Sequence, residues 1–178
     1  MTAGQVSDTP YQAHRLSVSI DAPFDDFRRR YEAAVPTYDA QAFNALVERK
    51  ASWSDMLDLM DRSAPYGFLT YWSTDAQPMM SLAGATARGV EYLMGNHTIA
   101  ERMFRRDPTV LMYVPLRTVI TSRGNGVTHF SVDRPSSVLS SFGDDGIAAV
   151  GVELDHKVAG LLAHLDAPVP SPLLAASS

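Results

Sequence analysis

The sequence predicts an α+β fold, a small antiparallel or mixed sheet of roughly four or five strands with helices packed on one side. Three observations carry this prediction. Apolar and polar residues alternate from Tyr11 to Ile20, which is the two-residue period of a half-buried strand. Apolar residues recur at helical spacing from Asp144 to Leu165. The segment from Val90 to Pro135 marks a strand, a helix and a hairpin in turn.

The first strand leads into a predicted helix. Asp21 is suited to cap this helix, and Pro23 suits its first turn because proline is preset for helical geometry. One apolar stripe runs along the helix, formed by Phe24, Phe27 and Tyr31.

Two further helices are predicted before the second strand. Ala40–Lys50 carries apolar residues at helical spacing, and Ser52 begins another helix with Asp55 in the capping-box position. The β-forming residues of Tyr66–Thr74 predict a strand. Ser81–Ala87 fits a loop and a weak edge strand equally well.

The most clearly bounded unit follows. Arg88–Met94 is a short strand, Gly95 and Asn96 turn the chain, and Thr98 with Glu101 forms a capping box that predicts a helix start. The next strand, Leu111–Arg123, is expected to bend at Pro115, because proline cannot donate a hydrogen bond to a sheet.

Asn125-Gly126 predicts a two-residue hairpin turn. This turn would pair Val119 with Val132 and Thr121 with Phe130, and would direct these four side chains to the core. The opposite face is predicted to meet solvent or a ligand, and it carries Thr118, Ile120, Ser122, His129, Ser131 and Asp133.

The closing helix is capped by Asp144 and has an apolar stripe made by Ile147, Val150, Gly151, Leu154, Val158, Leu161, Leu162 and Leu165. We therefore divide the chain into a flexible arm at 1–10 and a single α+β domain at 11–166. Within that domain, 37–63 is a helical insertion. Residues 167–178, rich in Pro, Ala and Ser, are predicted to be a disordered tail.

Composition excludes several classes of protein. The formal net charge is −5, and the basic clusters Arg28–Arg30 and Arg105–Arg106 lie beside acidic residues in predicted helices, so we expect no nucleic-acid partner. The sequence has no cysteine, which excludes thiol nucleophiles and disulfides. No apolar run approaches the ~20 residues that cross a bilayer, so we expect no membrane partner and a cytoplasmic location.

Several motifs occur in one order along the second half of the chain. They are MGNHTIAERM, the Asp107-Pro108 break, VPLRTVI, FSVDRPSS and VGVELDHKVAGLL. From Tyr92 to Leu165 the sequence resembles the family of domains of unknown function numbered 302. The resemblance implies a small α+β fold that pairs into dimers, without established catalytic residues. Two positions depart from the family pattern, because Gly95 replaces a common Cys and His97 replaces the usual Pro.

His97 is the first candidate for catalysis. It lies at a predicted helix N-terminus, where unpaired N–H groups favour anions and where the helix dipole lowers a histidine pKa. Arg117 is a second candidate, able to pair with a carboxylate. The structural alternatives are an ordinary first-turn residue for His97, and for Arg117 an ion pair with Asp133 or Glu101.

We expect the ligand-binding side chains to be Asn96, Trp72, Tyr113 and Glu101. Tyr71 is a candidate, with Trp72, for the wall of a ligand site, and the structural alternative for both aromatic residues is the core. The sequence leaves any cofactor unknown. No metal site is predicted, because no zinc-binding spacing occurs among His14, His97, His129, His156 and His164.

The sequence therefore predicts a homodimer with a small-molecule pocket, between the insertion at 37–63 and the helix start at His97, and leaves catalysis open. Aromatic and methionine side chains would supply the apolar wall, and the helix N-terminus with Arg117 would orient an anionic or carbonyl group. The alternatives are a non-catalytic protein-interaction module and, less favoured, haem or metal binding through His97. Neither the ligand nor a reaction follows from the sequence.

Overall fold

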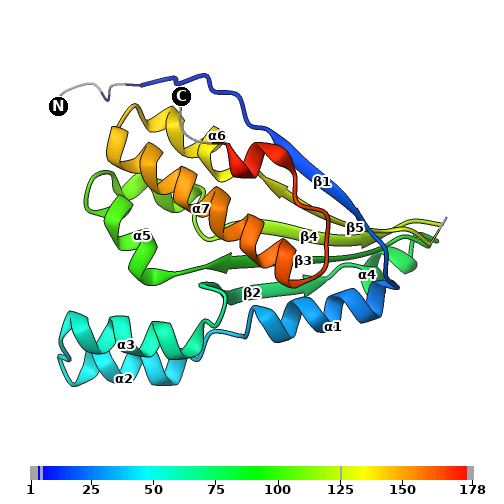
Figure 1. Ribbon diagram of the computed structural model, residues 1–178, viewed down its shortest axis with the longest axis horizontal. Coiled ribbons are helices and arrows are strands. Elements are labelled where there is room, and N and C mark those ends of the chain that lie inside the picture. Colours follow the sequence, from blue (N-terminus) through cyan, green and yellow to red (C-terminus); the bar gives the residue numbers. More distant parts are fainter. Residues whose placement is uncertain (1–3, 5, 125, 176–178) are drawn as a thin grey trace.

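The structure, a computed structural model, describes residues 4, 6–124 and 126–175. Within them the chain forms one antiparallel sheet of five strands in the order β1-β5-β4-β3-β2 (Figure 1). The strands are β1 Arg15–Ile20, β2 Leu69–Asp75, β3 Arg88–Gly95, β4 Leu116–Ser122 and β5 Thr128–Asp133.

Helices precede, connect and follow these strands. The α-helices are α1 Phe24–Ala34, α2 Ala40–Glu48, α3 Trp53–Ser63, α4 Gln77–Ser81, α5 His97–Phe104, α6 Pro135–Leu139 and α7 Asp145–His164. Short 3-10 helices are η1 Pro108–Met112, η2 Ser140–Phe142 and η3 Ser171–Leu174. In Figure 1, α7 lies across the sheet, and the α2–α3 pair extends from one end of the molecule. The predicted α+β fold is confirmed.

Only one face of the sheet is deeply buried. Along β4, Thr118 and Ile120 are fully buried, whereas Arg117, the residue before Thr118, is exposed. The buried face packs against the apolar stripes of α1 and α7, including Phe27, Tyr31 and Val158. The opposite face carries half-buried Val119 and Thr121 and is not covered by the helices that form this core.

The hairpin register differs from the prediction by one residue. Ser122 lies opposite Thr128 and Ile120 opposite Phe130, so Thr118 and Ile120 face the core in place of Val119 and Thr121. On β5, Phe130 and Val132 face the core as predicted.

The physical reason lies in the turn. The Gly126 N–H donates to the Arg123 carbonyl at 2.8 Å, and Gly126 has a φ of 76°. The strand ends Ser122 and Thr128 are therefore separated by an odd number of residues, whereas the predicted two-residue turn requires an even number. A shift of one residue in the pairing moves every side chain of a strand to the opposite face. The predicted turn residue Asn125 lies outside the described residues.

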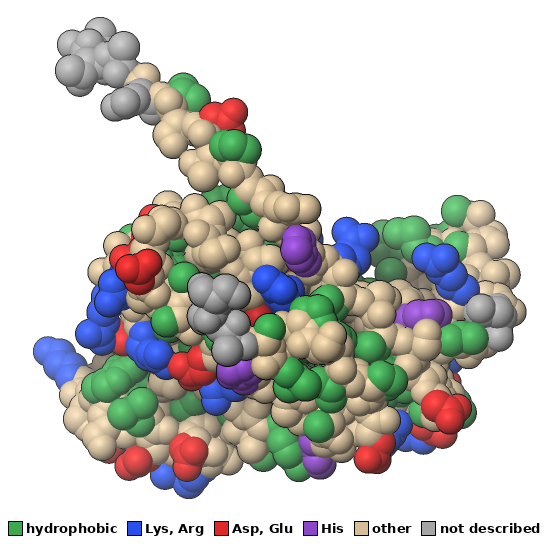
Figure 2. All heavy atoms as spheres, turned by 45° about the horizontal axis from the view of Figure 1, so that its top comes forward, with side chains coloured by type: hydrophobic (Ala, Val, Ile, Leu, Met, Phe, Trp, Pro, Cys, Tyr) green, Lys and Arg blue, Asp and Glu red, His purple; other side chains and the backbone are tan. Residues whose placement is uncertain are grey.

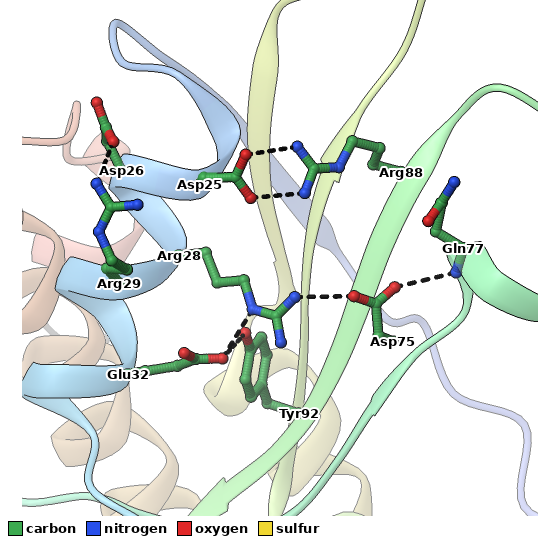
Figure 3. A network of polar contacts seen from close by, with 9 residues as sticks. All are labelled: Asp25, Asp26, Arg28, Arg29, Glu32, Asp75, Gln77, Arg88 and Tyr92. Atoms are coloured by element: carbon green, nitrogen blue, oxygen red, sulfur yellow. Dashed lines mark hydrogen bonds and ion pairs between the residues drawn. The ribbon is translucent and has the colours of Figure 1, made fainter.

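Charged side chains attach α1 to the edge of the sheet (Figure 3). The Arg28 guanidinium donates to Glu32 at 2.9 Å and to Asp75 of β2 at 2.8 Å. The buried Tyr92 hydroxyl donates to the same Glu32 carboxylate at 2.8 Å. These contacts satisfy a phenol that would otherwise be buried without a partner.

The two terminal segments differ in how closely they pack against the rest of the protein. Residues 6–13 are exposed, and Figure 2 shows an arm that extends away from the rest of the molecule, while Tyr11 packs against Tyr113. The tail predicted to be disordered instead contains η3, with Leu173 fully buried in the main core and Ala167 also buried. Leu173 gives the tail an apolar anchor despite its composition. Residues 1–3, 5 and 176–178 lie outside the described part.

No helix in the described part of the chain is long and apolar enough to cross a bilayer.

Replacing Val158 with Asp should prevent stable folding, because Val158 is fully buried in the core between α7 and the sheet. An unpaired buried carboxylate costs about 4 kcal/mol or more. Thermal melting checks this, with His156→Asp as the control at an exposed position on the same helix. Equal melting temperatures for the two variants would contradict the packing of α7.

Candidate functional site

A cavity of about 270 Å³ lies where β3 ends and α5 begins. Its walls are almost entirely apolar, and its volume is slightly below the usual range of about 300–1,000 Å³ for ligand sites. The residues that line it are Phe68, Tyr71, Gly95, Asn96, His97, Ile99, Ala100, Met103, Leu111, Val114, Pro115, Leu116 and Leu154.

Asn96 fixes the geometry of this corner. Its side-chain oxygen accepts from the N–H groups of Thr98 at 2.9 Å and Ile99 at 3.2 Å, so Asn96 is the N-cap of α5. Its side-chain nitrogen donates to the Gly67 carbonyl at 2.9 Å. The predicted cap, Thr98, lies inside the helix. Asn96 is better placed because its short side chain reaches two N–H groups that lack helical partners.

His97 is the first residue of α5 and is enclosed by aromatic rings. Its ring meets Tyr38 at 5.2 Å, Phe43 at 5.6 Å and Tyr71 at 4.9 Å between centroids, in edge-on arrangements. Burial lowers the pKa of His97. The direction agrees with the prediction, but its cause is desolvation, which disfavours the charged imidazolium.

The Tyr71 hydroxyl is the unusual polar group of the cavity. It is buried, lies near the backbone of His97, and makes no hydrogen bond of acceptable geometry with any described group. Burial, reinforced by the neighbouring Tyr38 phenol, raises the pKa of Tyr71, so the phenol stays protonated. A buried hydroxyl without a partner costs about 1–3 kcal/mol, which a ligand that accepts its proton would recover.

Gly95 gives the cavity room. A Cβ at this position would lie 3.1 Å from the Tyr71 ring and 3.2 Å from the Pro115 Cβ, closer than most side-chain contacts. Any larger side chain at this position would therefore press on two walls of the cavity.

The insertion supports the cavity without lining it. Phe43 and Met60 form a separate apolar cluster with Ala64 and Leu69. Within the described residues, α2 and α3 make no hydrogen bond or ion pair with the rest of the protein. They are therefore held by apolar contacts, among them the Phe43 contact with the His97 ring.

The structure separates the other predicted site residues from His97. Arg117 is mostly exposed on the open face of the sheet and pairs with Glu91 at 2.9 Å. Trp72 is 48% exposed, and its Cα partner Leu93 is in turn paired with Arg117 on that same face. Tyr113 packs edge-on against Tyr11 and Phe142.

Glu101 also lies away from the cavity, in an ion pair with Arg105 one turn along α5. Of the predicted residues, only His97 and Asn96 line the cavity, and Asn96 is engaged in capping. Tyr71, which the sequence suggested only as a wall residue beside Trp72, also lines the cavity.

Another hollow, of about 740 Å³, lies on the open face of the sheet. Its lining is mainly polar and includes Arg15, Arg117, Arg123 and His129. Among the described residues, no three His, Asp or Glu side chains gather in a way that could hold a metal ion. The cavity beside His97 is too small to enclose a porphyrin.

Comparison with known proteins identifies the family. A profile of the family described as "Domain of unknown function DUF302" matches residues 58–165, more than half of the chain. The chain belongs to the DUF302 family. Every residue that lines the cavity falls within the matched region. No curated protein matches the chain.

The structure also resembles a solved one. The crystal structure of an uncharacterised conserved DUF302 protein from Bacillus stearothermophilus superposes with a TM-score of 0.61 at 14% sequence identity. The alignment covers 85% of this chain and 97% of the other. At this identity the likeness shows the fold alone.

The chemistry available in the cavity is limited to two side chains. Tyr71 can donate a proton in a hydrogen bond, and a neutral His97 can donate at one ring nitrogen and accept at the other. The lining contains no carboxylate, amine or guanidinium.

We predict that His97 titrates below its ordinary value of 6.5. As the pH falls through 6.5, His97 takes up a proton in the unfolded chain before it does so in the folded protein. The stability that neutral His97 contributes is therefore fully present above pH 6.5 and is lost as the pH falls below it. NMR titration of the His97 ring measures the midpoint. His97→Phe keeps an aromatic ring and should reduce the loss of melting temperature between pH 7.5 and 5.5. A midpoint at or above 6.5 would show that the ring is solvated.

Proposed function

We propose that this DUF302 protein binds a small molecule in the cavity beside His97 and acts as a homodimer. The observation that carries the proposal is the buried Tyr71 hydroxyl, which lies against an apolar cavity and whose proton no described group accepts. A core side chain in that position would normally be paired. An orienting polar group in an otherwise apolar cavity is typical of ligand sites.

Binding is favoured over catalysis by the same lining. General acid–base catalysis needs a donor and an acceptor aligned on the reacting atoms, and nucleophilic catalysis needs an activated nucleophile. His97 and Tyr71 supply a possible acceptor and donor, but the lining contains no Ser, Cys, Thr or Lys side chain and no carboxylate. Any reaction at this site would therefore depend on these two side chains alone.

The open face of the sheet supports the proposed dimer. Strand spacings of about 4.8 Å and a rise of about 3.3 Å per residue give five strands a face of roughly 20 by 24 Å. That is roughly 500 Å² in projection, against about 800 Å² per partner in a standard interface. Half-exposed Trp72 and exposed Met112 would add to it.

The charges on this face are mixed in a way that suits a second copy. Arg117 pairs with Glu91 at 2.9 Å, and Arg15 lies 4.0 Å from Asp133. A two-fold contact brings the same surface against itself, so a face with both signs of charge and an apolar centre at Val119 can be complementary to its own copy.

A second candidate function, the non-catalytic interaction module, has one observation in its favour. The α2–α3 pair exposes three large apolar side chains, namely Val47 at 70%, Trp53 at 46% and Leu57 at 45%. Exposed apolar groups of this kind mark partner surfaces when they are contiguous. Replacement of Trp53 by Ser should leave ligand binding unchanged if the cavity is the functional site.

Filling the cavity should abolish ligand binding. Ala100 is on α5 and lines the cavity, so Ala100→Leu occupies space that a ligand needs. We expect naphthalene, a rigid apolar probe, to bind the wild-type protein and to bind this variant at least tenfold more weakly in an NMR titration. Ala163→Leu, at an exposed position of α7, is the matched control. Equal naphthalene binding by all three proteins would place any binding outside the cavity.

A charge at the centre of the open sheet face should break the dimer. We expect the wild-type protein to sediment at twice 19.4 kDa at micromolar concentration. Val119→Arg should sediment as a monomer, because two copies would bury like charges against each other. Val47→Arg, on the exposed surface of α2, should remain dimeric. A wild-type mass near 19.4 kDa, or dissociation by Val47→Arg alone, would contradict this interface.

A further inference from the structure

The walls of the cavity beside His97 are deeply buried apolar side chains. Phe68 and Met103 are fully buried, and Leu154 is 3% exposed. Leu111, which is 59% exposed, lies at the rim where the cavity meets solvent. A ligand that fills this space gives up its water along most of its surface, which favours an apolar body.

Negative charge has little to bind to in this cavity. The Asn96 side chain occupies the N–H groups of Thr98 and Ile99, and the Ala100 N–H is bonded to the Asn96 carbonyl. The positive end of α5 is therefore largely closed to an anion. The sequence-predicted cation, Arg117, is paired with Glu91 on the open sheet face.

Positive charge has no partner either. None of the lining side chains is acidic. The Tyr71 phenol stays protonated because burial raises its pKa. Transfer of an unpaired ion into such a space is strongly unfavourable.

Two polar side chains of the lining, the His97 imidazole and the Tyr71 hydroxyl, remain available to a ligand. The Asn96 oxygen accepts from the N–H groups of Thr98 and Ile99, and its nitrogen donates to the Gly67 carbonyl. The Tyr71 hydroxyl is buried, and no protein group in the described part of the chain accepts its proton. A ligand group placed beside it needs an acceptor atom.

We infer that the cavity takes an uncharged, largely apolar molecule whose oxygen or other acceptor atom receives a hydrogen bond from the Tyr71 hydroxyl. A ketone, ester or ether on a compact hydrocarbon body has this chemistry. The inference rests on the proposed function and adds the class of ligand to it.

Three probes of matched shape test the inference: 2-acetylnaphthalene, 2-ethylnaphthalene and 2-naphthoate. The first has a carbonyl acceptor, the second has none, and the third carries a negative charge. Affinities are measured by calorimetric or NMR titration on the wild-type protein, on Tyr71→Phe, which keeps the ring and removes the hydroxyl, and on Tyr66→Phe. Tyr66 is 37% exposed and stacks on His164, so it is the control for loss of a hydroxyl elsewhere.

The ratio of the wild-type affinity to the Tyr71→Phe affinity cancels differences in hydrophobicity between probes. We expect this ratio to be roughly three to ten for the ketone, the value of one hydrogen bond, and about one for the hydrocarbon. The carboxylate should bind at least tenfold more weakly than the ketone. Tyr66→Phe should change none of the affinities.

A ketone ratio near one, or tightest binding of the carboxylate, would overturn the ligand class while the binding function stands, because the probes still bind. Failure of all three probes to bind the wild-type protein would overturn the binding function together with the inference.

Discussion

The corner of the structure where ligand chemistry is possible depends on the side-chain amide of Asn96. Its oxygen caps α5 and its nitrogen holds the Gly67 carbonyl just before β2, so one residue joins the end of β3, the start of α5 and the approach to β2. His97 follows Asn96 directly, and Tyr71 lies on the strand that Gly67 precedes. The relative positions of these two side chains therefore follow from a cap, and the same cap uses the helix N–H groups that would otherwise attract an anion.

Because helices cover only one face of the sheet, the molecule has two separate surfaces that could bind a partner, the cavity at the end of the core and the open face of the sheet. Burial of Tyr92, Ile120 and Phe130 against α1 and α7 forms the core, and the cavity opens at the end of that core, where β3 gives way to α5. The alternate residues of the same strands remain on the other face, with paired charges around Val119. Ligand binding and subunit pairing can therefore be assigned to separate surfaces. A mutation in the cavity leaves the open sheet face unchanged, and a mutation on that face leaves the cavity unchanged.

Much of the fold could be predicted from local sequence signals, because the strongest ones coincide with burial. The stripe of α7 and the pair Phe27 and Tyr31 are buried as their spacing indicates. The candidate site was harder to predict, since side-chain direction along a strand changes with every residue. A one-residue slip in the hairpin reversed the faces of β4, and a bulge between Thr70 and Trp72 places Tyr71, rather than Trp72, at the cavity. Bulges and turn lengths depend on tertiary packing, so alternation alone could not have located them.

The account is tested most directly by identifying what the protein carries. Untargeted mass spectrometry would compare the wild-type protein and Ala100→Leu, both purified from the native host under non-denaturing conditions. The account predicts an uncharged, mainly apolar compound with an acceptor atom, present with the wild-type protein and depleted from the variant. A charged metabolite retained equally by both proteins would contradict it.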